Sequence, residues 1–310
     1  MDNIAYQPPV TFLVEDDRSG YHVSMKMKKV WAVQIDLLEQ LKRTCKKYGL
    51  TYFADSGTLL GAIRHEGFIP WDDDIDIVMK RSDYNKLIEI ADDEFLFPYF
   101  LQSAHSEVFP RGYARLRNSN TTALTKRDLG KPINHGIFID IFPVDNIPDD
   151  IKVRTAWIKK IVFLNKIINA GTMKEIRNSE LLRDRVRIII CRLLVKMIGY
   201  NEMVWQYEKL CSKYNNIKTK SISYVAYSQG KQKHIWDRVC YDSYHSVPFE
   251  YTTINIPDGY DSRLRVEYGE YMKPVRAGTF HGEVILEPDI PFKDYLLNHS
   301  TEEISKYFES

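Results

Sequence analysis

The chain has 310 residues, of which 44% are hydrophobic and 27% charged, a composition typical of a globular protein with one large domain or two smaller ones. Its 43 basic and 42 acidic residues leave a formal net charge of +1, so bulk charge gives no support to nucleic-acid binding. The four cysteines lack metal-site spacing and are expected to be reduced thiols of a cytosolic protein: Cys45, Cys191, Cys211 and Cys240.

Residues 1–24 are predicted to form an N-terminal arm that is a tail or only loosely packed. They carry the acidic run Glu15-Asp16-Asp17 and no apolar core, so we expect no signal peptide. No run of about 18 apolar residues occurs along the chain, so we expect no membrane-spanning helix. The protein is therefore expected in the cytoplasm.

A helix is predicted over residues 25–48, because apolar side chains recur there at helical spacing between Lys and Arg. Gly49 stands in the usual position for a helix end. Residues 50–54 then form a short apolar strand leading into the small-residue turn 55–58, on which a second helix could start. A glycine in such a turn lets a phosphate approach the backbone, and a helix N-terminus favours an anion.

Further strands are predicted along the next part of the chain. One covers residues 75–79, and another is the apolar run 136–143, which Pro143 is expected to end. Residues 113–116 and 121–125 are predicted to pair as a hairpin.

The predicted elements suggest three regions after the arm. Helices and strands alternate over residues 25–150, which indicates a mixed α/β sheet core. Residues 151–220 form a helical insertion with turn signals at Gly171 and Gly199. Residues 221–310 are expected to pack back on the core.

The helical insertion is basic. Residues 151–200 hold twelve Lys or Arg against three Asp or Glu, and the stretch 186–198 is apolar and basic together. Such a helix can lie on an anionic membrane surface. A peripheral membrane contact through 151–200, a core helix and a dimer contact all remain open.

Four carboxylates crowd into residues 72–76. Two unit charges about 4 Å apart repel by roughly 4 kcal/mol at an effective dielectric of about 20. Alternation along a strand puts Asp74 and Asp76 on one face, where a divalent cation could bind both. Oxygen ligands of this kind suit Mg²⁺, or Mn²⁺. Asp73 is expected to point into solvent, and a wholly solvated acidic loop is the alternative.

Asp140 is the candidate for a third carboxylate in such a site. It is the lone charge in the apolar run 137–142, where an unpaired carboxylate would be too costly, so it must meet a partner or a metal. Asp72 shares a face with Asp74 only if the strand begins early. A role in orienting the metal ligands is equally open for Asp72.

Three residue strings resemble the LicD family, a phosphocholine-transferase-like group in the nucleotidyltransferase superfamily that includes the fukutin-related proteins. They are DSGTLLGAIRHEGFIPWDDDIDI at 55–77, GIFIDIFPVD at 136–145, and EYGEYM at 267–272. In the third string Glu270 stands where the family pattern has Asp. The resemblance is strong over residues 30–150 and looser near the third string.

The resemblance implies a nucleotidyltransferase-like α/β (α+β) mixed sheet with a helical insertion and a C-terminal extension. It also implies a metal-dependent phosphotransferase that moves a phosphate-linked group, such as phosphocholine, from a CDP-linked donor to a sugar or lipid-linked glycan and releases CMP. Teichoic acid, lipopolysaccharide and capsule are the acceptors that it suggests. Asp74, Asp76 and Asp140 would hold Mg²⁺ or Mn²⁺ as the catalytic residues, with Asp140 also orienting or deprotonating the attacking hydroxyl.

The resemblance also places the donor phosphates on a turn of three small residues, Ser56, Gly57 and Thr58. Arg64 could reach a phosphate or form an ion pair with the acidic loop. Arg115 and Arg117 lie on one face of their predicted strand, where they bind phosphate or form a solvated sheet edge. Three tyrosines could form an aromatic wall for a choline head group or pack in the core: Tyr260, Tyr268 and Tyr271.

Two other functions remain open. An enzyme of the same fold could transfer the nucleotide itself, and product analysis would separate the two reactions because only the phosphotransferase releases free CMP. An inactive scaffold of this fold is the other alternative. Retention of Asp74, Asp76 and Asp140 argues against it, because an inactive site has no reason to keep carboxylates that repel one another.

Overall fold

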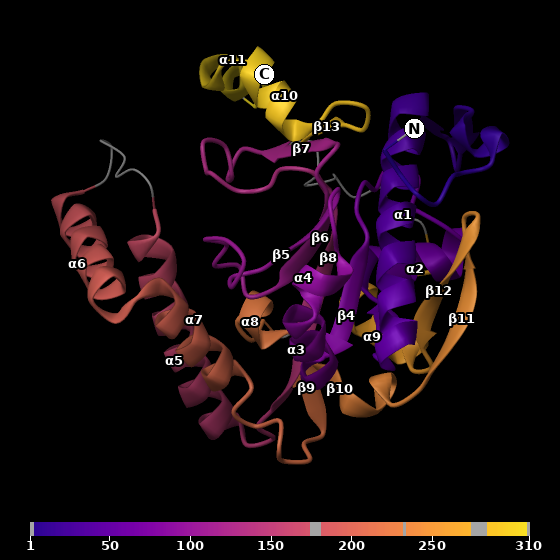
Figure 1. Cartoon of the computed structure of the whole chain (residues 1–310). Helices are drawn as coiled ribbons and strands as arrows, with labels where there is room; N and C mark the ends of the chain where they lie inside the picture. Colours follow the sequence, from indigo (N-terminus) through magenta and orange to yellow (C-terminus); the bar gives the residue numbers. More distant parts are fainter. Residues whose placement is uncertain (1–2, 174–180, 232–233, 274–283, 309–310) are drawn as a thin grey trace.

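The computed structural model describes residues 3–173, 181–231, 234–273 and 284–308. In these residues a mixed sheet of seven strands has the order β10-β9-β8-β4-β3, and β6 joins β8 and carries β5. Helix α1 runs along this sheet, and the long helices α5, α6 and α7 stand together away from it (Figure 1). The expected α+β fold with a mixed sheet is confirmed.

The sheet strands are β3 (Phe53–Ala54), β4 (Asp76–Lys80), β5 (Tyr99–Gln102), β6 (Ala114–Asn118), β8 (Ile137–Ile147), β9 (Ser221–Ser223) and β10 (Trp236–Asp237). Three smaller pairs are β1 (Asp16–Arg18) with β2 (Tyr21–Val23), β7 (Thr122–Thr125) with β13 (Val284–Glu287), and β11 (Tyr244–Phe249) with β12 (Thr252–Pro257).

The longer helices are α1 (Met25–Tyr48), α2 (Ser56–His65), α3 (Arg81–Glu89), α5 (Ile151–Gly171), α6 (Leu182–Ile198), α7 (Tyr200–Cys211) and α9 (Tyr260–Tyr268). The shorter ones are η1 (Val10–Leu13), α4 (Ala91–Glu94), α8 (Val225–Ser228), η3 (Arg238–Tyr241), α10 (Phe292–Asn298) and α11 (Thr301–Tyr307).

Helix α1 has the predicted bounds. The Ser24 hydroxyl caps it by accepting a hydrogen bond from the Met27 N–H, and Gly49 ends it in the left-handed conformation that glycine adopts without strain. Trp31, Ile35 and Leu38 on its inner face are fully buried in the main core, which also contains apolar residues of β4, β6 and β8. Helix α1 thereby fixes the position of the strands that carry the acidic residues.

Strand β8 does not end at Pro143, as the sequence led us to expect. It continues to Ile147, with Met79 and Pro143 in register in the parallel β4–β8 pair. On the other edge of β8, the pairing with β6 reaches only Ile141, and the pairing with β9 starts at Asp145. Proline is tolerated because it falls in the gap between these two partners, where no strand needs its missing N–H.

The predicted hairpin of residues 113–116 with 121–125 is wrong. Strand β6 pairs with β5 and β8, whereas β7 pairs with β13 from the C-terminal region. The turn between them does form, since the Thr121 N–H donates to the Asn118 carbonyl. The turn residues were therefore recognised correctly, but distant segments supply the strand partners.

The N-terminal segment is also more firmly packed than expected. Ile4 is buried in the main core, and the Asn3 amide donates to the Pro288 carbonyl at 2.8 Å. The Lys28 ammonium, which is only 1% exposed, donates to the Asp16 carboxylate at 2.9 Å. These contacts attach the segment both to α1 and to the C-terminal region.

Helices α5 and α7 pack around a separate apolar cluster, which includes Trp157, Ile161 and Met203. Gly171, at the end of α5, allows α6 to approach closely, because a Cβ there would lie 2.3 Å from Val195 Cγ2. Helix α6 ends at Gly199, the second predicted turn. Residues 174–180 of the basic segment lie outside the described residues, and no helix in the described part of the chain is long and apolar enough to cross a membrane.

The four cysteines are buried free thiols. This agrees with the expectation of reduced cysteines.

Candidate active site

Asp76 and Asp140 are brought together by the parallel pairing of β4 with β8, in which they are direct partners. Both side chains therefore leave the sheet on the same face. Burial, followed by the charges of Asp74, Asp140 and Asp72, raises the pKa of Asp76 well above its usual value. A cluster of carboxylates that repel one another in this way is a favourable place for a divalent cation.

Asp140 has a partner within the protein. Its Oδ1 accepts a hydrogen bond of 2.7 Å from Arg115 Nε, and Arg115 lies opposite Asp140 in the β6–β8 register. Arg115 is 5% exposed, so the solvated-edge alternative is wrong for it. Its Nη1 is buried and finds no hydrogen-bond partner in the described residues. Arg115 therefore neutralises Asp140 and keeps one donor available for another anion.

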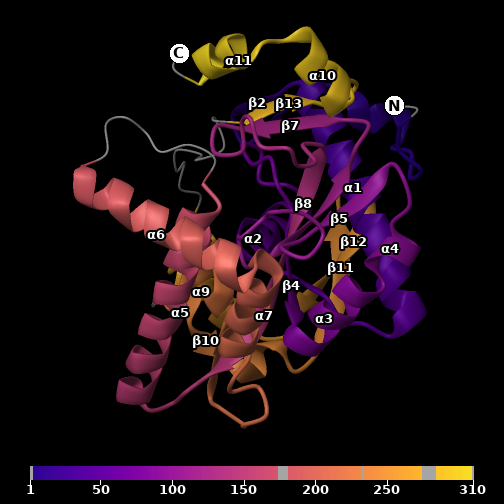
Figure 2. The same ribbon diagram turned by 60° about the vertical axis from the view of Figure 1, so that its left-hand side comes forward.

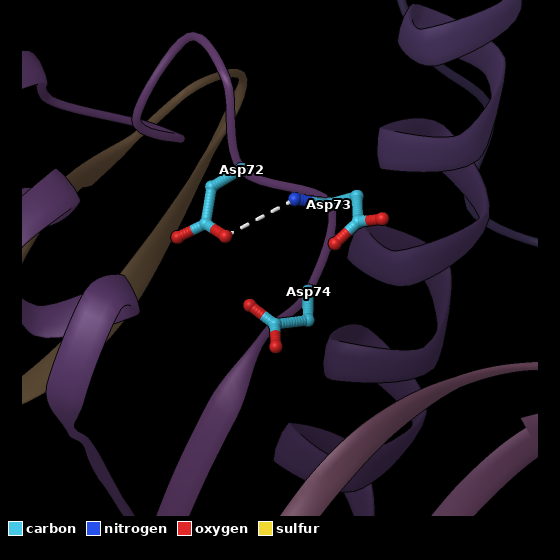
Figure 3. A group of neighbouring side chains, drawn as sticks. All are labelled: Asp72, Asp73 and Asp74. Carbon is cyan, nitrogen blue, oxygen red and sulfur yellow. Dashed lines mark hydrogen bonds between the residues drawn. The ribbon is translucent and has the colours of Figure 1, made fainter. Parts of the chain in front are cut away.

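Asp74 is not positioned by strand alternation, because β4 begins only at Asp76. Asp72, Asp73 and Asp74 instead lie on a loop that enters the strand, and each offers a carboxylate oxygen within 4.8 Å of the others (Figure 3). Asp73 was expected to point into solvent, but it is partly buried within this group. The Asp73 N–H also donates to Asp72 Oδ1 at 3.3 Å.

Two side chains of α1 hold the backbone of this acidic loop. Trp31 Nε1 donates to the Asp72 carbonyl at 2.9 Å, and Gln34 Nε2 donates to the Asp73 carbonyl at 2.6 Å. Both residues are buried, so the loop has fixed attachment points on the core. Helical periodicity in the sequence marks these positions only as buried, so their role at the site was missed.

The small-residue turn supports the acidic residues directly. A Cβ on Gly57 would lie 2.6 Å from Asp72 Oδ2, so the absent side chain leaves room for that carboxylate. The Thr58 hydroxyl accepts a hydrogen bond of 2.8 Å from the Asp76 N–H. Ser56 adopts a φ of 47°, which a residue with a side chain rarely does, at the first position of α2. The turn thus positions both the loop and the first residue of β4.

Asp55, directly before this turn, anchors a buried network from the C-terminal region. Its Oδ1 accepts a hydrogen bond of 2.7 Å from the Tyr241 hydroxyl, and its Oδ2 accepts one of 2.9 Å from Arg263 Nη2. Arg263 is fully buried and stacks over Trp236, with its guanidinium carbon 4.2 Å from the ring centre. No local sequence pattern predicts this network, because its members are roughly 200 residues apart along the chain.

The other two arginine candidates bond partners outside the acidic loop. Arg64 Nη1 donates to the Tyr271 carbonyl at 3.0 Å, and the described residues show no ion pair between Arg64 and the acidic loop. Arg117 is 1% exposed and donates to Gln102 Oε1 and to the Gly136 carbonyl. Burial, followed by the charge of Arg115, lowers the pKa of Arg117. The solvated-edge alternative is wrong for Arg117 as well.

The three tyrosine candidates differ from one another. Tyr271 is buried in the main core, and Tyr260 packs against that core. Tyr268 is 40% exposed, and the Asp76 charge contributes to raising its pKa, after burial and Glu267. Tyr227 was not among the tyrosines predicted from the sequence, and it is 49% exposed. Its pKa is raised to about 12 by burial first, then by Tyr113, and then by the charges of Asp76 and Asp140. Tyr227 and Tyr268 are therefore the partly exposed tyrosines whose pKa the carboxylate charges help to raise.

Comparison with known proteins gives a consistent result. Residues 49–167 match the LicD/FKTN/FKRP nucleotidyltransferase domain. The lipopolysaccharide cholinephosphotransferase LicD of Haemophilus influenzae is 25% identical over 252 residues, which are 80% of this chain and 92% of that protein. An uncharacterized protein of Rickettsia prowazekii is 32% identical over 113 residues, which are 36% of this chain and 39% of that protein. The matched domain contains the Asp55 turn, the acidic loop and Asp140, and the resemblance to the family is confirmed.

Proposed function

Because this chain belongs to the LicD family through its nucleotidyltransferase domain, we propose that it transfers a phosphate-linked group from a CDP-linked donor to a hydroxyl of a cell-surface glycan and releases CMP. Phosphocholine is the group that the Haemophilus relative suggests, and a lipopolysaccharide-like glycan is the corresponding acceptor. The pairing of Asp76 with Asp140, next to the acidic loop and within the family domain, is the observation that carries this proposal.

Asp74, Asp76 and Asp140 are the residues that would hold Mg²⁺, or Mn²⁺. Their oxygens suit a hard cation. Burial, and then repulsion by the neighbouring carboxylates, raises the pKa of Asp76, and a bound cation would relieve that repulsion. A bound divalent cation would neutralise charge on the transferred phosphoryl group. Asp72 and Asp73 lie close enough to Asp74 to orient it.

The reaction would be a displacement at the phosphorus atom bound to the head group. The acceptor oxygen forms a new bond to that phosphorus while the bond to the CMP oxygen breaks, and the hydroxyl proton passes to Asp140. Arg115 orients Asp140 through its Nε and has its unpaired Nη1 available for a phosphate oxygen. Ser56, Gly57 and Thr58, at the N-terminus of α2, lie beside the acidic loop, where the donor phosphates would bind.

Tyr227 and Tyr268 provide a surface for a choline head group. A quaternary ammonium binds aromatic faces by cation–π attraction, which is worth about 0.5–2 kcal/mol per contact. The two side chains are partly exposed, and the charges of the carboxylate cluster reach both hydroxyls. They replace Tyr260 and Tyr271 as the residues to test for head-group selection.

Helix α6 is the part of the chain that we propose contacts a membrane surface. Val186, Ile190, Leu193 and Met197 recur at helical spacing, and each is 48–81% exposed. Basic side chains lie along the same helix, so the exposed face combines apolar contact with attraction to anionic lipids. A glycan presented on a lipid would then meet the enzyme at the membrane surface.

The proposal is tested by incubating the protein with Mg²⁺, a glycan acceptor and CDP-choline, CDP-ethanolamine, CDP-ribitol or CDP-glycerol in turn. Free CMP and the mass of the modified acceptor are measured. An acceptor that gains a phosphate-linked head group while CMP appears in solution supports the phosphotransferase. An acceptor that gains the nucleotide would support the alternative nucleotidyltransferase. Unmodified acceptor with every donor would favour the inactive scaffold.

A further inference from the structure

A large cavity lies between the helical region and the sheet domain. It has a volume of about 1180 Å³, above the usual range for small-molecule sites. Helices α5 and α6 form one side, and the loops 106–111 and 127–133 form the other. Its walls are largely apolar, with Val108, Phe109 and Phe163 among the lining residues. Phe163 is 68% exposed.

The cavity is also strongly basic. Its lining includes five cationic side chains, Arg111, Arg127, Lys131, Lys166 and Arg187, against one acidic residue. That acidic residue, Glu107, accepts hydrogen bonds from the Gln102 amide and the Asn134 N–H. The lining residues alone therefore carry an excess of four positive charges, before ion-pair partners outside the lining are counted.

Two of these cations have no carboxylate partner among the described residues. Arg111 and Lys131 both bond Asp128, and Arg187 lies 3.5 Å from Asp184. Arg127 and Lys166 form no ion pair within the described part of the chain. They enter the cavity from opposite walls, Arg127 from a loop after β7 and Lys166 from α5. An anion between them would be attracted by both.

The cavity adjoins the candidate active site. The Phe109 ring, which lines the cavity, lies 5.7 Å from the guanidinium carbon of Arg115, and Arg115 bonds Asp140. On the opposite side the cavity borders α6. Cys191, on the inner face of α6, lines the cavity, and the outer face of α6 carries the exposed apolar side chains. Figure 2 shows α5 and α6 as one arm beside the sheet domain.

We propose that this cavity binds a long-chain lipid phosphate, with the alkyl chain on the apolar wall and the phosphate between Arg127 and Lys166. Inorganic phosphate would leave the apolar wall in contact with water, and a neutral lipid would leave the cations without a counter-charge. Charge complementarity together with the apolar wall therefore selects an amphiphilic anion. This identification rests on the proposed function: the ligand would be the lipid-phosphate end of the glycan acceptor. Phe109 would separate it from Arg115.

Binding is measured by isothermal titration calorimetry on the full chain, without donor and without Mg²⁺. The probes are dodecyl phosphate below its micelle concentration, inorganic phosphate and dodecyl maltoside. We expect dodecyl phosphate to bind at least about tenfold more tightly than either of the others. The double variant Arg127→Gln/Lys166→Gln should weaken dodecyl phosphate binding by about tenfold or more. The matched double variant Lys159→Gln/Lys160→Gln removes two charges of α5 outside the cavity and should keep the wild-type affinity.

A second variant, Ala170→Trp, fills the cavity from α5 and should weaken dodecyl phosphate binding without removing a charge. Circular dichroism and thermal melting check that each variant is folded. Equal affinity for dodecyl phosphate and inorganic phosphate, or for dodecyl phosphate and dodecyl maltoside, would overturn the proposal. So would equal weakening by the two charge-removing double variants. Because no donor is present, a negative result in this binding experiment does not count against CMP release. Conversely, absence of CMP release together with intact lipid binding counts against the proposed function alone.

Discussion

Asp76 and Asp140 face each other across the parallel β4–β8 pair, while Arg115 on β6 bonds Asp140 from the opposite edge of β8. Three adjacent strands thus place two carboxylates and one guanidinium in a row on one face of the sheet. Arg115 lowers the cost of burying Asp140 but leaves Asp76 among like charges. This arrangement leads us to expect competition between Arg115 and a metal ion for Asp140.

Replacing Arg115 tests that competition. Arg115→Met leaves Asp140 buried without its ion-pair partner, which should reduce the free energy of unfolding by about 3–5 kcal/mol. Saturating Mg²⁺ should then raise the melting temperature of the variant more than that of the wild type, because the freed carboxylate binds the cation more tightly. Arg111→Met, which breaks the Arg111–Asp128 pair away from the carboxylates, is the control and should show no extra response to Mg²⁺. An equal Mg²⁺ response in all three proteins would contradict the assignment of Asp140 as a metal ligand.

Gly57 should matter through Asp72. In Gly57→Ala the new Cβ displaces the Asp72 carboxylate, whereas stability should change by less than about 1 kcal/mol, since alanine favours the helix and Asp72 can move. We expect about tenfold slower CMP release from Gly57→Ala and from Asp72→Ala. The double variant should be no slower than either single one, because both changes remove the same interaction. Losses that multiply would show instead that Gly57 acts independently of Asp72, for example by admitting a donor phosphate.

His135 should make stability depend on pH. It is 1% exposed, and burial is the main cause that lowers its pKa to about 4. The unfolded chain therefore takes up a proton near pH 6.5 while the folded chain does not, so this contribution is present above about pH 6.5 and is lost as the pH falls towards 4. The loss should reach about 3 kcal/mol relative to His135→Gln. Urea unfolding at several pH values measures this loss of stability, and the variant His22→Gln, at an exposed histidine, serves as the control. Parallel pH profiles of stability for wild type and His135→Gln would contradict a neutral buried His135.

Helix α6 should control membrane association. The triple variant Ile190→Ser/Leu193→Ser/Met197→Ser removes apolar side chains that are exposed on one face and touch no part of the main core. We expect it to keep its melting temperature but to sediment less with vesicles of phosphatidylglycerol and phosphatidylcholine. Leu296→Ser/Leu297→Ser, on the C-terminal helix α10, is the matched control. If the triple variant instead changes the oligomeric state of the protein in solution and leaves vesicle binding intact, the face is a dimer contact.

Local patterns in the sequence predicted much of the fold. The spacing of apolar residues and Gly49 gave the bounds of α1, and the apolar runs located β4 and β8. Strand partners were less predictable. The β6–β7 hairpin failed because β13, about 160 residues away, pairs with β7, and a turn signal contains no information on such a partner.

The same distinction holds within the candidate site. The acidic run, the Gly57 turn and Asp140 stand out because charged or small residues interrupt apolar strings. The side chains that position them do not: Trp31 and Gln34 appear only as the inner face of a helix, and Arg263 lies 208 residues from Asp55. Strand alternation does not account for the positions of Asp74 and Asp73, because both precede β4 on a loop whose backbone accepts hydrogen bonds from α1.

The catalytic role of the carboxylate cluster is measured most directly by CMP release from CDP-choline in the presence of a glycan acceptor, as a function of Mg²⁺ concentration. Wild-type protein, Asp76→Asn and the exposed-surface control Asp92→Asn are compared. We expect CMP release to rise and saturate with Mg²⁺ in the wild type and the control and to stop on addition of a chelator. In Asp76→Asn it should fall by a factor of about 100 or more. Mg²⁺-independent release, or equal release from Asp76→Asn and wild type, would contradict the carboxylate cluster as the catalytic centre.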